Sequence, residues 1–418
     1  PRDLTDVAAW RRLERTAVKT AAVTVDKVNL DAVSTTGGKV DGKVTIGGAN
    51  IQGSVEVKGV ATPLGTAEGT VSFSPLGKDL FASWNALLSD VGEASIGVRI
   101  AFPQYPFDPA AWRQLGRGVV QSLTASFDDI AVDPVKLAKL GITVPYSGRA
   151  DVRIAVGAAA TAATIDVDLR TIEGGALVKP INVHAEATTD ATGTVASACV
   201  AGGDACAKGL AVASVPRLLE IKGVKVPVTF DAWIAAPKAA LGATLEGTIA
   251  IPSQSAPALM ALVGRNVFEN KKDSTLEGTI TVGGTLGKPT GKAAIAVNKL
   301  QLISHVEGRT IPELTSMTID AVWDGVEGDL KVVAKESNKG EMRVTASAKP
   351  DRLAEGTGSF KANHLDLAPL AAFLPGELAA SQGELNGLLT IKGFDPPTMR
   401  ADGAVTVDKA DVPPDPRI

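Results

Sequence analysis

Apolar and polar residues alternate along much of the chain, and this two-residue period constrains the fold more than any other feature. In "TIDVDLR" (164–170), Ile165, Val167 and Leu169 occupy every second position, between two aspartates and an arginine. The same alternation occurs in "GSVEVKG", "ADVRIAVG" and "GDLKVVAK". Successive side chains of a strand point to opposite faces of a sheet, so each segment has one apolar and one polar face. The pattern predicts antiparallel strands, because strands covered on both faces would be apolar throughout.

The composition favours strands and gives no sign of nucleic-acid binding or of a bilayer-spanning segment. Aromatic residues make up only 4% of the 418 residues, so packing relies on small and β-branched side chains, which strands favour. A net charge of -4 without long runs of like charge gives no electrostatic footprint for nucleic acid. No apolar run approaches the roughly 18 to 20 residues that span a bilayer, and "PRDLTDVAAW" does not read as a signal peptide. We interpret the sequence as an internal piece of a longer chain.

Apolar residues at three-to-four spacing predict a few short amphipathic helices that pack on the sheet. We expect them at about 4–18, 79–89, 109–124, 256–268 and 367–374. They divide the chain into three β segments, each led by a helix or containing one, at 1–108, 109–255 and 256–418. The alternative is one continuous elongated domain.

One supersecondary unit occurs twice near the C-terminus. "LEGTITVGGTLGKPTGKAAIAVNKLQL" (276–302) and "LNGLLTIKGFDPPTMRADGAVTVDKADV" (385–412) both read as strand, Gly/Pro turn, strand. The Gly-Lys pair of the first copy is not a phosphate-binding loop, because Leu286 stands at the position of its first glycine and Ala293 at that of its hydroxyl. We therefore expect Lys292 to lie on the polar face of a strand.

Residues that could carry chemistry are few. None of the histidines, His184, His305 and His364, has a partner at metal-ligand or triad spacing in the sequence. The acidic pairs Asp166 with Asp168 and Asp128 with Asp129 could do acid/base work, but such pairs are more often solvated surface. We expect no catalytic residues, no metal site, no cofactor and no enzyme activity.

The ordered string "LDLAPLAAFLPGELAASQGELNGLLTIKGFDPPTMRADGAVTVDKADVPP" (365–414) resembles the TamB and AsmA-like family of envelope proteins in double-membraned bacteria, and residues 276–302 resemble a second copy. Together the two stretches cover roughly a fifth of the chain. The resemblance implies a mainly β fold: an elongated, curled, U-shaped and predominantly antiparallel sheet that forms a groove. The sequence departs from the family in lacking the membrane anchor and a terminal partner-binding domain, and Phe394 stands where the turn usually has a small residue.

What the resemblance implies about function is a periplasm-spanning groove that moves phospholipid between the inner and outer membranes, with a role in outer-membrane protein assembly. It implies phospholipid acyl chains as cargo, an outer-membrane barrel partner through regions outside this chain, and attachment to the inner membrane by a segment not present here. A structural or adhesive β-repeat protein of the envelope, with a closed apolar core, is the alternative; a hydrolase would need a nucleophile beside a base.

From the alternation we predict that one concave apolar surface lines this groove. Its residues are Val55, Val57, Val152, Ile154, Val156, Ile165, Val167, Leu169, Ile280, Val282, Ile295, Val297, Leu389, Ile391, Val405 and Val407.

The two cysteines lie in "SACVAGGDACAKG", where glycines and an aspartate let the chain fold back on itself. A disulfide between Cys199 and Cys206 is sterically reasonable and would indicate an oxidising compartment, whereas two free thiols in a cytosolic loop are the alternative. The periplasmic setting that the resemblance implies favours the disulfide.

Overall fold

The computed structural model describes most of the chain, in stretches separated by gaps. The described residues are 6–14, 17, 21–29, 38–47, 50–62, 65–89, 92–139, 145–158, 161–175, 177–202, 217–262, 268–269, 271, 273–303, 311–368, 382–395 and 399–411. The chain divides into two compact units. Unit 1 is Pro1–Gly175, Ile181–Ala196 and Pro227–Pro237, and unit 2 is Ala176–Pro180, Ser197–Val226 and Lys238–Ile418.

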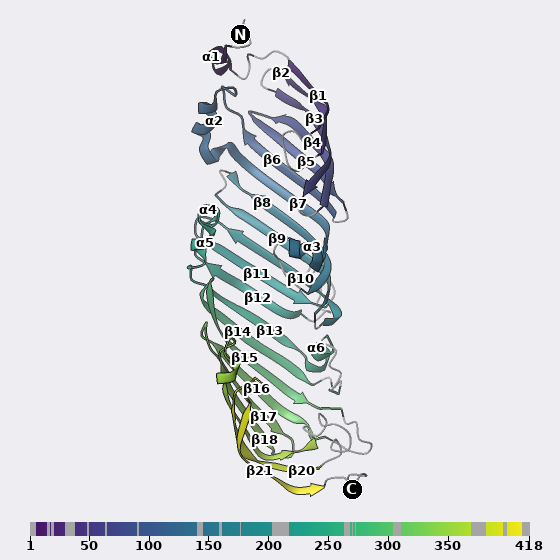
Figure 1. Ribbon diagram of the computed structural model, residues 1–418, viewed down its shortest axis with the longest axis vertical. Coiled ribbons are helices and arrows are strands. Elements are labelled where there is room, and N and C mark those ends of the chain that lie inside the picture. The colour runs from purple at the N-terminus through teal and green to yellow at the C-terminus, as the bar shows by residue number, and fades with distance from the viewer. Residues whose placement is uncertain are drawn as a thin grey trace. The chain divides into compact units, whose positions relative to one another are not determined.

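Unit 1 consists of strands with a few short helices (Figure 1). Its elements are α1 (Val7–Arg11), β1 (Ala21–Asn29), β2 (Lys39–Gly47), β3 (Asn50–Thr62), β4 (Gly65–Leu76), β5 (Asp79–Leu88), β6 (Gly92–Ala101), α2 (Pro109–Leu115), the 3-10 helix η2 (Gly116–Val119), β7 (Val120–Val132), α3 (Pro134–Lys139), β8 (Tyr146–Val156), β9 (Ala163–Gly174) and α4 (Phe230–Ala235). Three elements have residues in both units: β10 (Leu177–Thr189), β11 (Thr194–Ala201) and α5 (Pro237–Ala240).

Unit 2 has the same character. Its elements are β12 (Arg217–Val226), β13 (Glu246–Ser255), α6 (Ala256–Leu262), β14 (Thr275–Thr285), β15 (Lys288–Leu300), β16 (Leu314–Trp323), β17 (Gly328–Glu336), β18 (Glu341–Ala348), the 3-10 helix η4 (Leu353–Glu355), β19 (Thr357–Asp366), β20 (Gln382–Lys392) and β21 (Arg400–Asp411).

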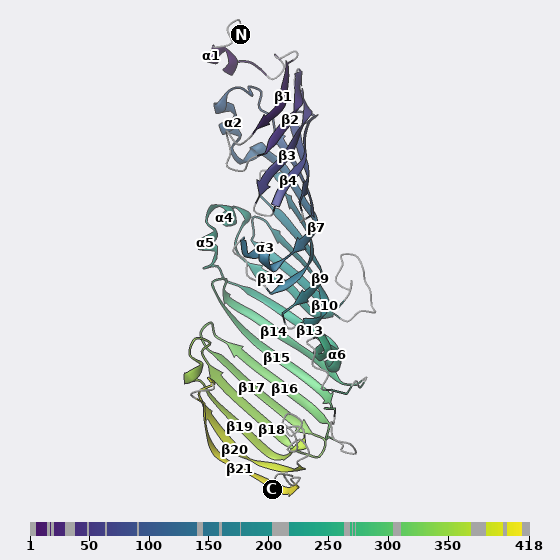
Figure 2. The ribbon, with the colours of Figure 1, turned by 45° about the vertical axis from the view of Figure 1, so that its right-hand side comes forward.

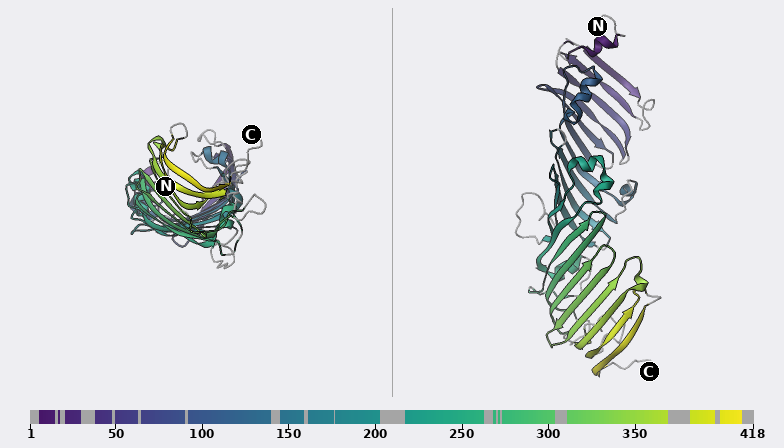
Figure 3. Two further views of the ribbon diagram at one scale, coloured as in Figure 1. Left: turned by 90° about the horizontal axis from the view of Figure 1, so that it is seen from below. Right: turned by 90° about the vertical axis from the view of Figure 1, so that its left-hand side faces the viewer.

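Strand pairing is antiparallel between neighbours in the sequence. It runs from β1 to β9 in unit 1 and from β12 to β21 in unit 2. Among described residues no pairing joins β21 back to β12, or β9 back to β1, so neither sheet closes into a barrel. The strands of unit 2 curve visibly (Figure 2), and seen from below they leave one side open (Figure 3). The predicted fold class is confirmed: mainly β, antiparallel, curled and open, with a few short helices.

Glycines on the strands permit this curl. A Cβ on Gly69 of β4 would lie 2.0 Å from the carbonyl oxygen of Asn85 on β5, which is far inside contact distance. Gly387 of β20 has a φ of 150°, and its Cβ would lie 2.3 Å from the carbonyl oxygen of Ala404. Only glycine lets neighbouring backbones approach so closely, and such positions are where sheets bend.

The duplicated strand-turn-strand unit is confirmed in both places. The first copy is the hairpin β14–β15 and the second is β20–β21. Lys292 pairs with Thr281 across the first hairpin and is exposed, as the sequence predicts for a polar-face residue. The unusual Phe394 lies against Gly356 and Gly358, where a Cβ on Gly356 would come within 2.5 Å of its ring. These glycines leave room for a large residue after β20.

The helix predicted at 79–89 is wrong, because this segment is strand β5. Leu80, Trp84 and Leu88 are four residues apart, which resembles helical spacing, but with Ala82 and Ala86 between them they form an alternation at every second position. Their partners on β6 include Ile96 opposite Trp84. Alanine counts weakly as an apolar residue, which hid a regular alternation.

Three other predicted helices are shorter than expected. The segment 109–124 begins as α2, with Asp108 as its N-cap and Pro109 at its first position, but it ends at Gly116, whose φ is 52°. A left-handed glycine stops a helix, and the chain continues as η2 and strand β7. In the segment 4–18, the described residues contain α1, which ends at Arg11.

The segment 256–268 contains α6, with residues 263–267 outside the described residues. Of the segment 367–374, all but residues 367 and 368 also lie outside them. The sequence analysis missed α3, α4 and α5, which are short and irregular in pattern.

Candidate functional site

In unit 1 the strand register places all eight predicted lining residues on one face. Residues directly opposite each other in an antiparallel pair have side chains on the same face. Val55 lies opposite Val71, and the row continues through β5, β6 and β7 to Ile154 and then Ile165. Val57, Val152, Val156, Val167 and Leu169 belong to the parallel rows of that face.

The eight predicted residues of unit 2 also share a face. Ile295 lies opposite Ile319, and this row runs through Val332, Val344 and Phe360 to Leu389. The remaining members occupy adjacent rows of the same face: Ile280, Val282, Val297, Ile391, Val405 and Val407. We call this surface, in each unit, the apolar face.

The two faces of the sheets differ sharply in chemistry. Among the described paired positions, Glu336 at the end of β17 is the one charged residue on the apolar face, and Gln254 of β13, opposite Leu276, places a buried amide there. The other positions carry aliphatic, aromatic and small residues. The opposite face, the polar face, has Asp, Glu, Lys, Arg, Ser and Thr at the alternate positions. Alternation in sequence thus becomes separation in space.

The apolar face is neither closed nor fully exposed. Twelve of the sixteen predicted residues are half-buried, Val297 is buried, and Ile165, Val405 and Val407 are 42%, 38% and 40% exposed. On β14 the apolar-face residues are half-buried while Thr279 and Thr281 on the polar face are exposed. In the described part of each unit, no second sheet covers this face.

Unit 2 shows that the apolar face has two distinct ends. One row, the closed end, contains Leu276, Val297, Met317, Ala334, Met342 and Ala362. A parallel row, the open end, contains Ile280, Ala293, Ala321, Leu330 and Ala346.

Packing at the closed end comes from segments outside the strands. Ala256 of α6 packs with Val297 and Leu300, and Phe268 contacts this cluster. A second cluster joins Leu302, Ile311 and Ala368. Val297 is therefore only 3% exposed, whereas Leu330 at the open end is 38% exposed.

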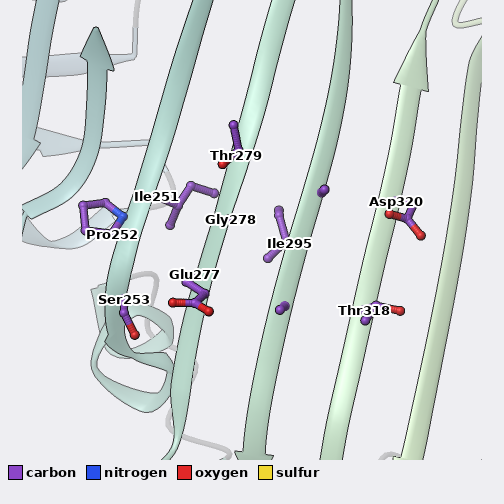
Figure 4. A pocket seen from close by; sticks show the side chains of 11 residues that line it. Ile251, Pro252, Ser253, Glu277, Gly278, Thr279, Ile295, Thr318 and Asp320 are labelled. Atoms are coloured by element: carbon purple, nitrogen blue, oxygen red, sulfur yellow. The ribbon is translucent and has the colours of Figure 1, made fainter.

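The polar face has shallow hollows in the described part of the chain. The hollow over β13 to β16 has a volume of about 520 Å³, and Figure 4 shows its lining, which includes Ser253, Glu277, Thr279, Thr318 and Asp320. Its lining contains carboxylates and hydroxyls but neither histidine nor cysteine. A nucleophile held beside a base, which acyl-transfer chemistry needs, is not part of this lining.

The structure brings together a cluster that the sequence analysis did not find. His184 on β10 lies 2.6 Å (Nδ1 to Oδ1) from Asp168 on β9, and Asp166 lies beside them, so the three form a group with metal-ligand chemistry. The side chains of Asp166 and Asp168 are only 13% and 23% exposed, less solvated than expected. The guanidinium of Arg153 lies 4.0 Å from the first and 3.8 Å from the second, so a positive charge already faces both carboxylates.

Other titratable groups on the polar face form ordinary ion pairs. Asp129 pairs with Arg149 and Arg170 at 3.2 and 3.3 Å, and Asp128 lines another shallow hollow. In unit 2, His364 lies 3.2 Å from Glu384, and Lys409 also pairs with that carboxylate. Sequence spacing could not reveal either His–carboxylate pair, because the partners lie on neighbouring strands. His305 lies outside the described residues.

Cys199, near the end of β11, is disulfide-bonded. Its predicted partner, Cys206, lies outside the described residues, so the pairing stays a prediction.

Comparisons of the chain with protein-family models, with curated proteins and with solved structures gave no match. Among the described residues, no helix has the length and apolar character needed to cross a membrane.

Proposed function

We propose that the chain is a segment of a phospholipid-transfer protein whose apolar face carries acyl chains while headgroups stay in water. One observation carries this proposal: each unit has a wide, half-buried apolar face that, in the described residues, no second sheet covers. A closed structural core would leave such a row buried along its whole length. The resemblance to the TamB and AsmA-like family agrees with the same reading.

The energetics favour a surface of this kind. Two acyl chains contain roughly 30 methylene-type groups, and at about 0.8 kcal/mol each their exposure to water costs on the order of 24 kcal/mol. A continuous aliphatic surface lowers that cost without specific contacts, so chains can slide along it. Strong binding pockets would hinder movement, which fits a face made of Val, Ile, Leu, Ala and Gly.

The cell envelope is the proposed location. A disulfide at Cys199 supports an oxidising compartment such as the periplasm. The proposal assigns membrane anchoring and an outer-membrane barrel partner to regions beyond this chain.

The test measures bound lipid and stability on the same protein. We expect phospholipid to co-purify with the chain, and Val282→Glu to reduce it several-fold, because an unpaired carboxylate in the path of the chains is costly to desolvate. Thr281→Glu is the matched control, since Thr281 is the preceding residue and lies on the polar face.

Mass spectrometry of the extracted lipid, beside thermal unfolding, separates the outcomes. Lost lipid with near-normal stability in Val282→Glu supports a conduit. Unfolding of Val282→Glu alone would indicate the closed-core alternative, and equal lipid in a folded Val282→Glu would contradict the proposal.

A further inference from the structure

Glu336 is anomalous because it is an ionisable residue buried on the apolar face. It is the last residue of β17, follows Ala334 on that face, and is 4% exposed. Its Oε2 accepts a hydrogen bond from the backbone N–H of Asp366 at 2.8 Å, and the Asn338 side chain also hydrogen-bonds the carboxyl. Its Oε1 has no hydrogen-bond partner among the residues that the structure describes. A buried polar atom without a partner costs free energy, so its presence calls for an explanation.

Glu336 contacts a short chain segment near the closed end. The Asp366 carboxylate accepts from the N–H of Ala368 at 2.7 Å, and the carbonyl of Gly383 accepts from the N–H of Leu367 at 2.9 Å. Ala368 is 3% exposed and packs against Leu302 and Ile311. The three residues Asp366–Ala368, which we call the latch segment, are thus tied to β17 through the Glu336 carboxyl group and to β20 through the Leu367–Gly383 hydrogen bond.

The protonation state of Glu336 determines how stable the closed arrangement of the latch segment is. Burial is the largest effect on Glu336 and raises its pKa to about 7, although the hydrogen bonds from the Asp366 N–H and the Asn338 side chain act in the opposite direction. The nearby charge of Asp366 adds to the rise. The neutral acid tolerates the apolar surroundings, whereas the carboxylate must lose its solvation and also face Asp366. Opening the latch segment would let water reach the carboxylate and relieve both costs.

In the described part of the chain, the other charged groups near Glu336 are paired with each other or exposed. The Glu313 carboxylate pairs with Lys271 at 3.2 Å, and Lys339 in the β17–β18 turn is exposed. On the neighbouring strands, Glu341 pairs with Arg343 and His364 with Glu384. Lys335 is exposed on the polar face of β17. Asp366 is the one charge among these that shifts the pKa of Glu336.

We propose that Glu336 is a proton-controlled latch: its neutral carboxyl closes the latch segment over the closed end of the apolar face, and its ionisation releases that segment. The device goes beyond lipid transfer and stands whether or not the apolar face carries lipid. Opening would expose Ala368 and the residues beneath it, and so extend the accessible part of the apolar face at neutral to alkaline pH.

Hydrogen exchange of the latch segment tests this inference. The raised pKa means that closure is fully stable below pH 4.5, weakens as pH rises toward 7, and changes no further once both states are ionised. Protection of peptides covering 362–368, corrected for intrinsic exchange, should fall roughly 50- to 100-fold between pH 5 and pH 8. Peptides from β14 and β15 should keep constant protection.

Two variants locate the effect. Glu336→Gln cannot ionise and keeps an acceptor for Asp366, so its protection should be independent of pH. Glu384→Gln is the control: hydrogen bonds from Lys409 and His364 lower the pKa of Glu384, so that carboxylate stays ionised throughout, and the variant should behave like wild type.

Constant protection in wild type, or an equal fall in Glu336→Gln, would overturn the latch. If Glu336→Gln does not fold, Glu336→Met replaces it as the variant that cannot titrate. Wild-type protein alone also tests the proposal, because the latch requires that protection of peptides 362–368 falls as pH rises.

Discussion

The closed and open ends of the apolar face in unit 2 are built from the same strands, yet they differ in packing. Both rows come from one face with one alternation pattern, and their members are separated along each strand by only a few residues. Val297 at the closed end is 3% exposed, while Leu330 at the open end is 38% exposed. The difference comes from what packs against them: Ala256 of α6 and Phe268 pack against the cluster that contains Val297, Leu276 and Met317 at the closed end.

Alternation in the sequence therefore creates an apolar face but does not determine whether that face is packed or exposed. Where segments from between the strands return over the face, it becomes a core that stabilises the sheet. Where the described residues leave it uncovered, its side chains reach water, as Leu330 does. A single sheet can therefore have a packed core at one end and, in our proposal, a lipid-binding surface at the other.

The largest expected effect is a charge at the closed end. Val297→Glu places a carboxylate among Ala256, Leu300 and Phe268, where it has neither water nor a partner. We expect a loss of about 3 to 5 kcal/mol in unfolding free energy, as for an uncompensated buried charge. Denaturant unfolding measures it, with Thr281→Glu on the polar face as control. A loss below about 1 kcal/mol would show that the closed end is not a core.

An intermediate effect is expected at the glycines that let the sheet curl. Gly387 belongs to the closed-end row, opposite Ala362, and its φ of 150° disfavours any side chain. Gly387→Ala should cost about 1 to 3 kcal/mol of unfolding free energy. Gly291, on the apolar face opposite Val282, has room for a Cβ, whose nearest atom is 3.5 Å away.

Gly291→Ala is therefore the matched substitution, and it should change the free energy by less than about 0.5 kcal/mol in either direction. Denaturant unfolding measures both variants. If they lose equal unfolding free energy, the close approach of neighbouring strands is not the reason for glycine at position 387.

The smallest effect on stability is expected at the open end. Leu330→Glu introduces a charge where the side chain already reaches water, so the carboxylate stays hydrated. We expect a loss of about 1 kcal/mol or less, from lost apolar burial alone. Thermal unfolding of this variant beside Val297→Glu gives the contrast directly. Comparable losses in both would mean that the two ends do not differ.

The sequence predicts the faces of the sheet well because they depend only on neighbouring residues. A one-residue shift in strand pairing would turn every apolar side chain to the other face, so the register is strongly specified. Ile280, Val282 and Ile295 therefore lie on the same face once the hairpin forms. The segment 79–89 was misread because Ala82 and Ala86 look neutral in the pattern. Nothing local distinguishes Val297 from Ile280, since the residues that cover Val297 are distant in sequence.

The same limit applies to the polar groups. His184 meets Asp168 across two strands, 16 residues away. Glu336 reads as an ordinary residue at the end of a strand, and only the return of β19 buries its carboxyl. Such features depend on chain topology, which alternation does not encode.

Photo-crosslinking from defined positions tests directly whether phospholipid contacts the open end of the apolar face. A photoreactive amino acid is introduced separately at Leu330 on the open end, at Ala334 on the closed end and at Lys331 on the polar face, in protein produced in an oxidising compartment. Mass spectrometry then identifies the adducts. The account predicts phospholipid adducts at position 330 and few or none at 331 or 334; adducts absent from 330, or equally frequent at 331, would contradict it.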